Sequence, residues 1–170
     1  MQHVATMRGY APGDLNALYD ITLRTGADGT DATAMFDEPK LPGLLYAAPY
    51  VTFQPELALV VEDQDGVVGY CVGALDTRKF EDLLERKWWP PLRERFPANL
   101  GDERGTEYPG NAEMIALIQP PHAPDWLAEQ YRSHLHINLL PCLQGQGHGL
   151  QLLRMAGSRP FAKVERLPPR

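Results

Sequence analysis

The chain has 170 residues, the size of one ordinary domain that can bury a core without cross-links. Its net charge of −6 and the lack of a Lys/Arg run argue against a nucleic-acid partner. The sequence has two distant cysteines, no basic stretch followed by an apolar leader, and no apolar run long enough to span a bilayer. These features predict a cytoplasmic protein with no membrane partner.

Patterns in the N-terminal part predict a strand, two helices and a long loop. Residues 3–10 alternate like an edge strand, and residues 11–29 place apolar side chains at helical spacing, with Gly26 as the stop signal. A second short helix is expected over residues 31–36. Residues 37–56 are punctuated by prolines, which predicts a lid or binding loop.

A β-hairpin is the clearest local prediction, over residues 57–77. Two runs rich in β-branched residues flank a turn built on Asp63, Asp65 and Gly66. The second run ends at Asp76, a carboxylate that follows an otherwise apolar strand.

The next part of the chain has mainly helical patterns. Residues 78–97 have a helical charge pattern that two prolines interrupt near Trp88 and Trp89. Residues 99–110 are polar and rich in turn formers. Residues 112–132 resemble two short helices around a proline-rich break, and we expect them to decorate the surface of the core.

The stretch "LLPCLQGQGHGLQLL", residues 139–153, joins a strand expected over 133–140 to a helix expected over 147–157. A helix start offers unpaired amide donors and the positive end of the helix dipole, and glycine lets a phosphate approach the backbone closely. The turn therefore predicts an anion site. The buried candidates of the helix include Leu150, Leu153 and Met155.

Two common phosphate-binding turns do not fit this stretch. A P-loop would need Gly-Lys-Ser/Thr after the glycines, which is absent. A dinucleotide fingerprint counted from Gly145 would require its third glycine at Leu150, and too little chain follows for the remaining strands. A glycine turn that only reverses the chain stays open as an alternative.

The remaining match is to the GNAT acyltransferase superfamily, whose turn has the motif Gln/Arg-x-x-Gly-x-Gly/Ala. Gln144, Gly147 and Gly149 stand at its positions, and the order of the expected elements also resembles the GNAT order. Within the superfamily, residues 65–97 and 134–141 look similar to the acetyltransferase-like domain of eukaryotic O-GlcNAcases and its stand-alone bacterial relatives.

The resemblance implies an α/β (α+β) fold in one domain over residues 1–170, with a mixed central sheet, splayed at its fourth strand, and flanking helices. It implies an N-acetyltransferase that moves the acetyl group of acetyl-CoA to a small-molecule or peptide amine by direct attack. A coenzyme-A-binding or pseudo-acetyltransferase module stays open as the alternative.

The same resemblance implies that the domain is truncated after the helix that follows the fourth strand. A GNAT domain normally continues there, so we expect the part from about residue 157 to be atypical or missing. Apolar surface left open on the strand and helix could be covered by a homodimer.

Coenzyme A contacts also follow from the resemblance. Backbone amides of the turn that Gln144 begins would bind the pyrophosphate, and Ile137 and Leu139 could pair with the pantetheine arm as if it were a strand. The expected contact residues are Ile137, Leu139, Gln144, Gly145, Gln146, Gly147, His148, Gly149 and Leu150.

The attacking amine must be neutral, so a base or a water chain has to remove its proton. Asp76 is our candidate base, ahead of Glu62 and Asp63, although Asp76 could instead cap the helix that begins near Lys79. Many family members use a tyrosine on a later helix to protonate the departing thiolate, and no position here matches it.

A metal site is a different class of hypothesis for His134, His136, Cys142 and His148, because side chains two apart on a strand share a face. Strong ligand spacings such as Cys-x-x-Cys or His-Glu-x-x-His are absent. Partly buried histidines that face a cleft explain the pattern more simply, so we expect no metal.

Overall fold

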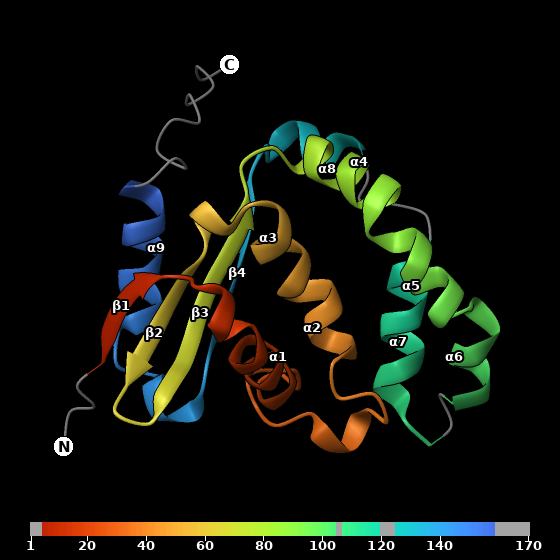
Figure 1. Cartoon of the computed structure of the whole chain (residues 1–170), viewed down its shortest axis with the longest axis horizontal. Coiled ribbons are helices and arrows are strands. Elements are labelled where there is room, and N and C mark those ends of the chain that lie inside the picture. Colours follow the sequence, from red (N-terminus) through yellow and green to blue (C-terminus); the bar gives the residue numbers. More distant parts are fainter. Residues whose placement is uncertain (1–4, 105–106, 120–124, 159–170) are drawn as a thin grey trace.

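The computed structural model describes residues 5–104, 107–119 and 125–158, and it has an α/β architecture (Figure 1). The strands are β1 (Thr6–Gly9), β2 (Leu59–Asp63), β3 (Gly66–Ala74) and β4 (His134–Leu139). The helices among the described residues are α1 (Leu15–Arg24), α2 (Leu41–Tyr46), α3 (Ala48–Phe53), α4 (Thr77–Lys87), α5 (Trp89–Arg95), α6 (Ala98–Arg104), α7 (Pro109–Ile118), α8 (Asp125–Gln130) and α9 (His148–Ser158).

One sheet with the order β1-β2-β3-β4 forms the centre of the molecule. All three described pairings are antiparallel, so the expected mixture of strand directions is not found among the described strands. The predicted hairpin is confirmed as β2 and β3, with an irregularity in register between Val61 and Glu62. Figure 1 shows α9 on one face of the sheet and α1, α2 and α3 on the other.

Two apolar clusters stabilise this arrangement. The first joins the sheet to α1, α3, α4 and α9, and Leu18 and Tyr70 are fully buried in it. The second joins α2, α5 and α7, and Leu41 and Ile118 are fully buried there. Trp88, at the predicted break between α4 and α5, packs against both clusters and donates a hydrogen bond from Nε1 to the Leu44 carbonyl oxygen (2.9 Å).

The prediction of a loop over residues 37–56 is wrong, because this segment forms α2 and α3. Pro42 and Pro49 stand in the first turns of these helices, where a missing N–H costs nothing and the fixed φ favours the helix. The apolar residues between the prolines are buried against α1 and the sheet. The prolines therefore begin helices here.

Three smaller expectations also change. The short helix expected over residues 31–36 is a single 3₁₀ turn (Thr33–Met35). The polar residues of α6 are helical where a turn was expected, and α7 is a core element, since Ile115 and Ile118 are almost fully buried. Burial against α2 and α5 thus makes α7 part of the core, although the prolines that follow it had suggested a peripheral segment.

On α9, Leu152 and Ala156 are the buried residues, whereas Leu150 and Leu153 are exposed by 53% and 45%. The prediction that Leu150 and Leu153 are buried is wrong, because the sheet covers only the narrow face that residues four apart share. The expected atypical part from about residue 157 lies almost entirely outside the described residues. Among the described helices, none is long and apolar enough to cross a membrane.

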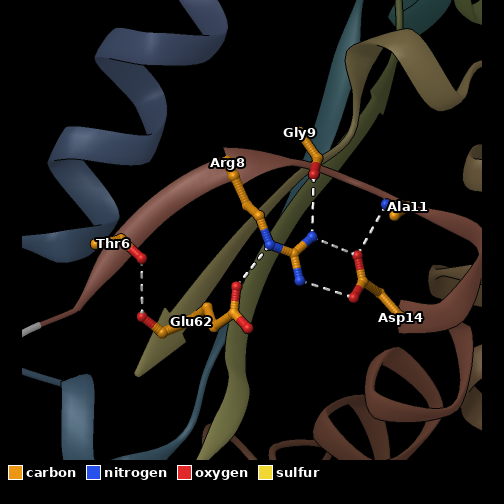
Figure 2. Close-up of polar contacts among 6 residues, drawn as sticks. All are labelled: Thr6, Arg8, Gly9, Ala11, Asp14 and Glu62. Atoms are coloured by element: carbon orange, nitrogen blue, oxygen red, sulfur yellow. Dashed lines mark hydrogen bonds and ion pairs between the residues drawn. The ribbon is translucent and has the colours of Figure 1, made fainter. Parts of the chain in front are cut away.

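Arg8 on β1 ties the edge of the sheet to the start of α1 (Figure 2). Its guanidinium donates two hydrogen bonds to the Asp14 carboxylate (2.7 and 2.9 Å), and its Nε donates to Glu62 on β2 (2.6 Å). The same Asp14 carboxylate accepts a hydrogen bond from the Ala11 amide (2.8 Å). Asp14 is 9% exposed, so its charge is well shielded and depends on these partners.

Asp14→Asn is expected to lower the free energy of unfolding by about 1–3 kcal/mol at neutral pH, because Arg8 then loses one of its two carboxylate partners. The hydrogen bonds from Arg8 hold the pKa of Asp14 below its usual value. A depressed carboxyl pKa contributes stability above the unfolded-state value, and this is lost as the pH falls through the folded-state value. Urea unfolding should therefore show the gap between wild type and variant closing below about pH 4; a gap that stays constant into acid would contradict this account.

Candidate functional site

β4 leads to α9 through a turn whose backbone is open on one side. The chain passes a 3₁₀ turn (Pro141–Leu143) and then four exposed residues, 144–147. Gly145 and Gly147 have φ values of +73° and +84°, which favour glycine, and a Cβ built at either would meet no atom within 4 Å. The glycines therefore leave free space directly beside the N-terminus of an 11-residue helix.

Side chains of the turn hold it against β4. Gln144 donates hydrogen bonds from Nε2 to the carbonyl oxygens of Leu139 (2.9 Å) and Gly29 (3.0 Å), and Gln146 donates to the Cys142 carbonyl oxygen (2.5 Å). The glutamine side chains are thus structural, and the backbone amides are left for a ligand. At the start of α9, the Nδ1 atom of His148 is buried without a hydrogen-bond partner among the described residues.

A groove of about 270 Å³ runs beside β4 and ends at the turn; we call it the β4 groove. It is lined by Thr25, Gly29, Ile137, Asn138, Leu139 and Gln144. The structure thus brings together three of the sequence-predicted contact residues, and the remaining ones follow Gln144 in the turn.

A second cavity of about 340 Å³, the inner cavity, lies between α1, α2, α7 and β4. Thr25 and Asn138 line both spaces, and the Asn138 amide donates a hydrogen bond to the Thr25 hydroxyl (2.7 Å). Two carboxylates, Asp28 and Glu113, line the inner cavity, while no Lys or Arg does so among the described residues. This cavity therefore offers a negative environment directly beside the β4 groove.

A hydrogen-bonded cluster at the inner cavity was not found from the sequence. The Tyr50 hydroxyl lies 2.8 Å from Nε2 of His134 and 3.0 Å from Nε2 of His136, and the Thr77 hydroxyl lies 2.8 Å from Nδ1 of His134. The spacing of the two histidines on one strand did signal a shared face. Tyr50 could not be added, because it belongs to the segment that was expected to be a loop.

The metal hypothesis gains no support from this cluster, since both histidines bond to a tyrosine. In the part of the chain that the structure describes, no three His, Cys, Asp or Glu side chains are placed to hold a metal ion.

Asp76, the sequence-predicted base, lies away from the β4 groove and the inner cavity. Its carboxylate caps α4 by accepting the Lys79 amide (3.1 Å), so the alternative interpretation as a helix cap is confirmed. That hydrogen bond lowers its pKa, which makes the carboxylate a weaker base. Asp76 lines a third space of about 480 Å³, the outer cavity, together with Arg78 and Arg132. A catalytic role for Asp76 stays a prediction.

Glu62 and Asp63 are also engaged elsewhere. Glu62 accepts a hydrogen bond from the Arg8 guanidinium, on the side of the sheet away from β4. Asp63 accepts a hydrogen bond from the Asp65 amide in the hairpin turn (2.8 Å). Neither lines the β4 groove or the inner cavity.

Comparison with known proteins identifies the family. No protein-family model matches the chain. The crystal structure of SsHAT is similar over 94% of this chain and 77% of SsHAT, with 33% sequence identity and a TM-score of 0.75. The chain belongs to the GNAT acetyltransferase superfamily. This membership confirms the fold class and supports acyltransferase activity in general terms.

The matches to O-GlcNAcases agree with the resemblance seen in the sequence. The O-GlcNAcases of Rattus norvegicus and Mus musculus are each 29% identical over 114 residues, which are 67% of this chain and 12% of either O-GlcNAcase. The polyamine N acetyltransferase of Drosophila melanogaster covers 96% of this chain and 73% of its own, at 16% identity and a TM-score of 0.47. A similarity at that level says nothing about the acceptor used here.

The glycine turn of this GNAT chain fits a coenzyme A pyrophosphate on three observations. The two positive-φ glycines leave open space, the first amides of α9 have no partner within the helix, and His148 has a buried nitrogen without a hydrogen-bond partner among the described residues. These are properties of an anion site that uses the main chain in an acidic protein.

Proposed function

We propose that the chain is an acetyl-CoA-dependent N-acetyltransferase. The observation that carries the proposal is the open glycine turn at the N-terminus of α9, at one end of the β4 groove. A groove beside a strand, ending at a row of free amides, suits a long ligand with an anionic group at one end.

The proposed contacts follow the order of the chain. The amides from Gly145 to Leu150 would hold the pyrophosphate, with Gln144 fixing the turn through its two carbonyl contacts. The backbone of Ile137 and Leu139 would hold the pantetheine arm along the β4 groove. When bound, acetyl-CoA supplies an acyl thioester.

The inner cavity is the proposed acceptor site. Its carboxylates, Asp28 and Glu113, favour a cationic amine, and Phe36 and Tyr46 provide aromatic walls for an alkyl chain. Thr25 and Asn138 border both spaces, so an amine bound there lies next to the β4 groove. We therefore propose a small-molecule amine, or an amine carried on a peptide, as the acceptor.

Location and assembly are further parts of the proposal. Two free cysteines, Cys71 and Cys142, support a reducing, cytoplasmic setting. The exposed Leu150 and Leu153 on α9 support a homodimer that covers this face.

The test of turnover is release of the coenzyme A thiol from acetyl-CoA in the presence of a panel of primary amines. Thiol release that requires both the protein and an alkylamine, with the acetylated amine detected by mass spectrometry, is the expected result. Acetyl-CoA hydrolysis without amine is the control. Binding of coenzyme A with no thiol release for any amine would instead identify a binding module without turnover.

A further inference from the structure

A continuous row of hydrogen bonds leads from the inner cavity to the far end of β4. His136 lines the cavity, Tyr50 bonds to it from α3, and His134 bonds to the same tyrosine hydroxyl. Thr77, at the start of α4, ends the row at Nδ1 of His134. Tyr50 is 6% exposed, so its hydroxyl serves these partners within the protein rather than bulk water.

We propose that His136 is the base that deprotonates the acceptor amine, and that Tyr50 and His134 carry the proton away from the cavity. This inference rests on the proposed function. It assigns the base to the inner cavity itself, whereas Asp76 lines the separate outer cavity.

The partners of each group indicate where the protons lie before reaction. The Thr77 hydroxyl can donate toward the Tyr131 carbonyl oxygen (3.5 Å) and accept from Nδ1–H of His134. His134 Nε2 is then an acceptor for the Tyr50 hydroxyl. The Tyr50 oxygen in turn accepts Nε2–H of His136 (3.0 Å). This leaves the lone pair of the neutral His136 ring on Nδ1.

Proton transfer along the row balances with acetyl transfer. The acceptor ammonium gives one proton to His136 Nδ1, His136 passes its Nε2 proton to Tyr50, and the tyrosine passes its own to His134 Nε2. His134 releases its Nδ1 proton on the Thr77 side to water. The amine nitrogen bonds to the thioester carbonyl carbon, the C–S bond breaks, and the thiolate takes the second proton of the nitrogen. One proton is released overall.

The burial of His136, His134 and Tyr50 favours passing a proton along the row over holding a positive charge on one ring. Burial, with a smaller contribution from His134, lowers the pKa of His136 to about 4, so the ring is neutral at physiological pH and does not retain the proton. Burial also lowers the pKa of His134 and raises that of Tyr50, which keeps the phenol protonated. The titratable groups around His136 are Tyr46 on α2, Tyr50 on α3, His134 on β4, Asp28 after α1 and Glu113 on α7.

The row ends near solvent. Asp76 and Arg78, the chain neighbours of Thr77, both line the outer cavity. His134 and Leu139 are the two ends of β4, and the glycine turn follows Leu139. A proton released beside His134 therefore leaves at the end of the strand that is opposite to the glycine turn. The exit for the proton is thereby separated from the site proposed for the pyrophosphate.

Tyr50→Phe tests the relay because it removes one hydroxyl and keeps the ring that stacks on Phe80. We expect kcat/KM for 1,5-diaminopentane, or the best alkylamine of the panel, to fall about 100-fold at pH 7. The loss should shrink as the pH rises and the free amine becomes abundant. An arylamine, already neutral at pH 7, should lose much less. Coenzyme A affinity should not change.

Tyr70→Phe is the matched control, since it removes a buried hydroxyl that bonds to Thr22 (2.7 Å) outside the row. It should leave the ratio of alkylamine to arylamine activity unchanged. His136→Gln should reproduce the Tyr50→Phe selectivity, and the double variant should be no worse than either single one. In ¹⁵N-histidine NMR spectra, wild-type His136 should be protonated at Nε2 only.

A Tyr50→Phe protein that loses alkylamine and arylamine activity equally, or loses neither, overturns the relay while acetyl transfer stands. A wild-type protein that binds coenzyme A but transfers no acetyl group overturns the relay and the turnover together. Absence of coenzyme A binding overturns the proposed function itself.

Discussion

Gly147→Val is expected to weaken coenzyme A binding by about 100-fold or more while the chain remains folded. At φ +84° a β-branched residue is strained by roughly 1–2 kcal/mol, and its side chain enters the open space that the phosphate needs. Each loss of about 1.4 kcal/mol is tenfold in affinity, so the lost amide contacts and the exclusion of the phosphate by the side chain together reach this size. Isothermal titration calorimetry with coenzyme A measures the effect directly.

Gly66→Val is the control for backbone strain. Gly66 has φ +120° in the β2–β3 hairpin turn, and a Cβ there also meets no atom within 4 Å. It should cost stability but leave coenzyme A affinity unchanged. A Gly147→Val protein that binds as well as wild type would remove the turn from the proposed site.

Leu143→Ala should lower the free energy of unfolding by about 3 kcal/mol, the largest stability effect that we predict near the site. Leu143 is fully buried in the 3₁₀ turn before the glycines, where it approaches Gly69 on β3. The truncation leaves a cavity between β3 and the turn, so coenzyme A binding should weaken as well. Urea unfolding followed by circular dichroism gives the difference in free energy.

Leu117→Ala provides the comparison for the same substitution. Leu117 is 51% exposed on α7, so its truncation should change the free energy of unfolding by less than about 0.5 kcal/mol. Equal losses for the two variants would mean that the turn is not anchored by the core.

The sequence predicted those elements whose signal is local. The hairpin turn of Asp63, Asp65 and Gly66 and the proline break at Trp88 are confirmed, because turn chemistry and missing amide donors act within a few residues. The glycine turn before α9 also lies where the motif placed it.

Burial determined what the sequence did not predict. Prolines suggested a loop over residues 37–56, yet the first turn of a helix accepts proline and the apolar residues there pack against α1 and the sheet. Conversely, Leu150 and Leu153 looked like core residues, and only the geometry of the sheet reveals that Leu152 and Ala156 occupy the covered face. Such choices depend on partners distant in sequence.

The candidate site divides in the same way. Ile137, Leu139 and Gln144 share one groove because they surround a single strand and its turn, which the sequence determines locally. The proposed acceptor site combines α1, α2, α7 and β4, so no motif could reveal it. Tyr50, which joins His134 and His136, lies more than 80 residues before them. That contact exists only in the folded chain.

Calorimetric titration of the wild-type chain with acetyl-CoA is the most direct test of the central claim, that the turn before α9 and the β4 groove hold this ligand. We expect saturable one-to-one binding, displaced by free coenzyme A and lost in Gly147→Val. No heat of binding with acetyl-CoA, together with no competition by coenzyme A, would contradict it.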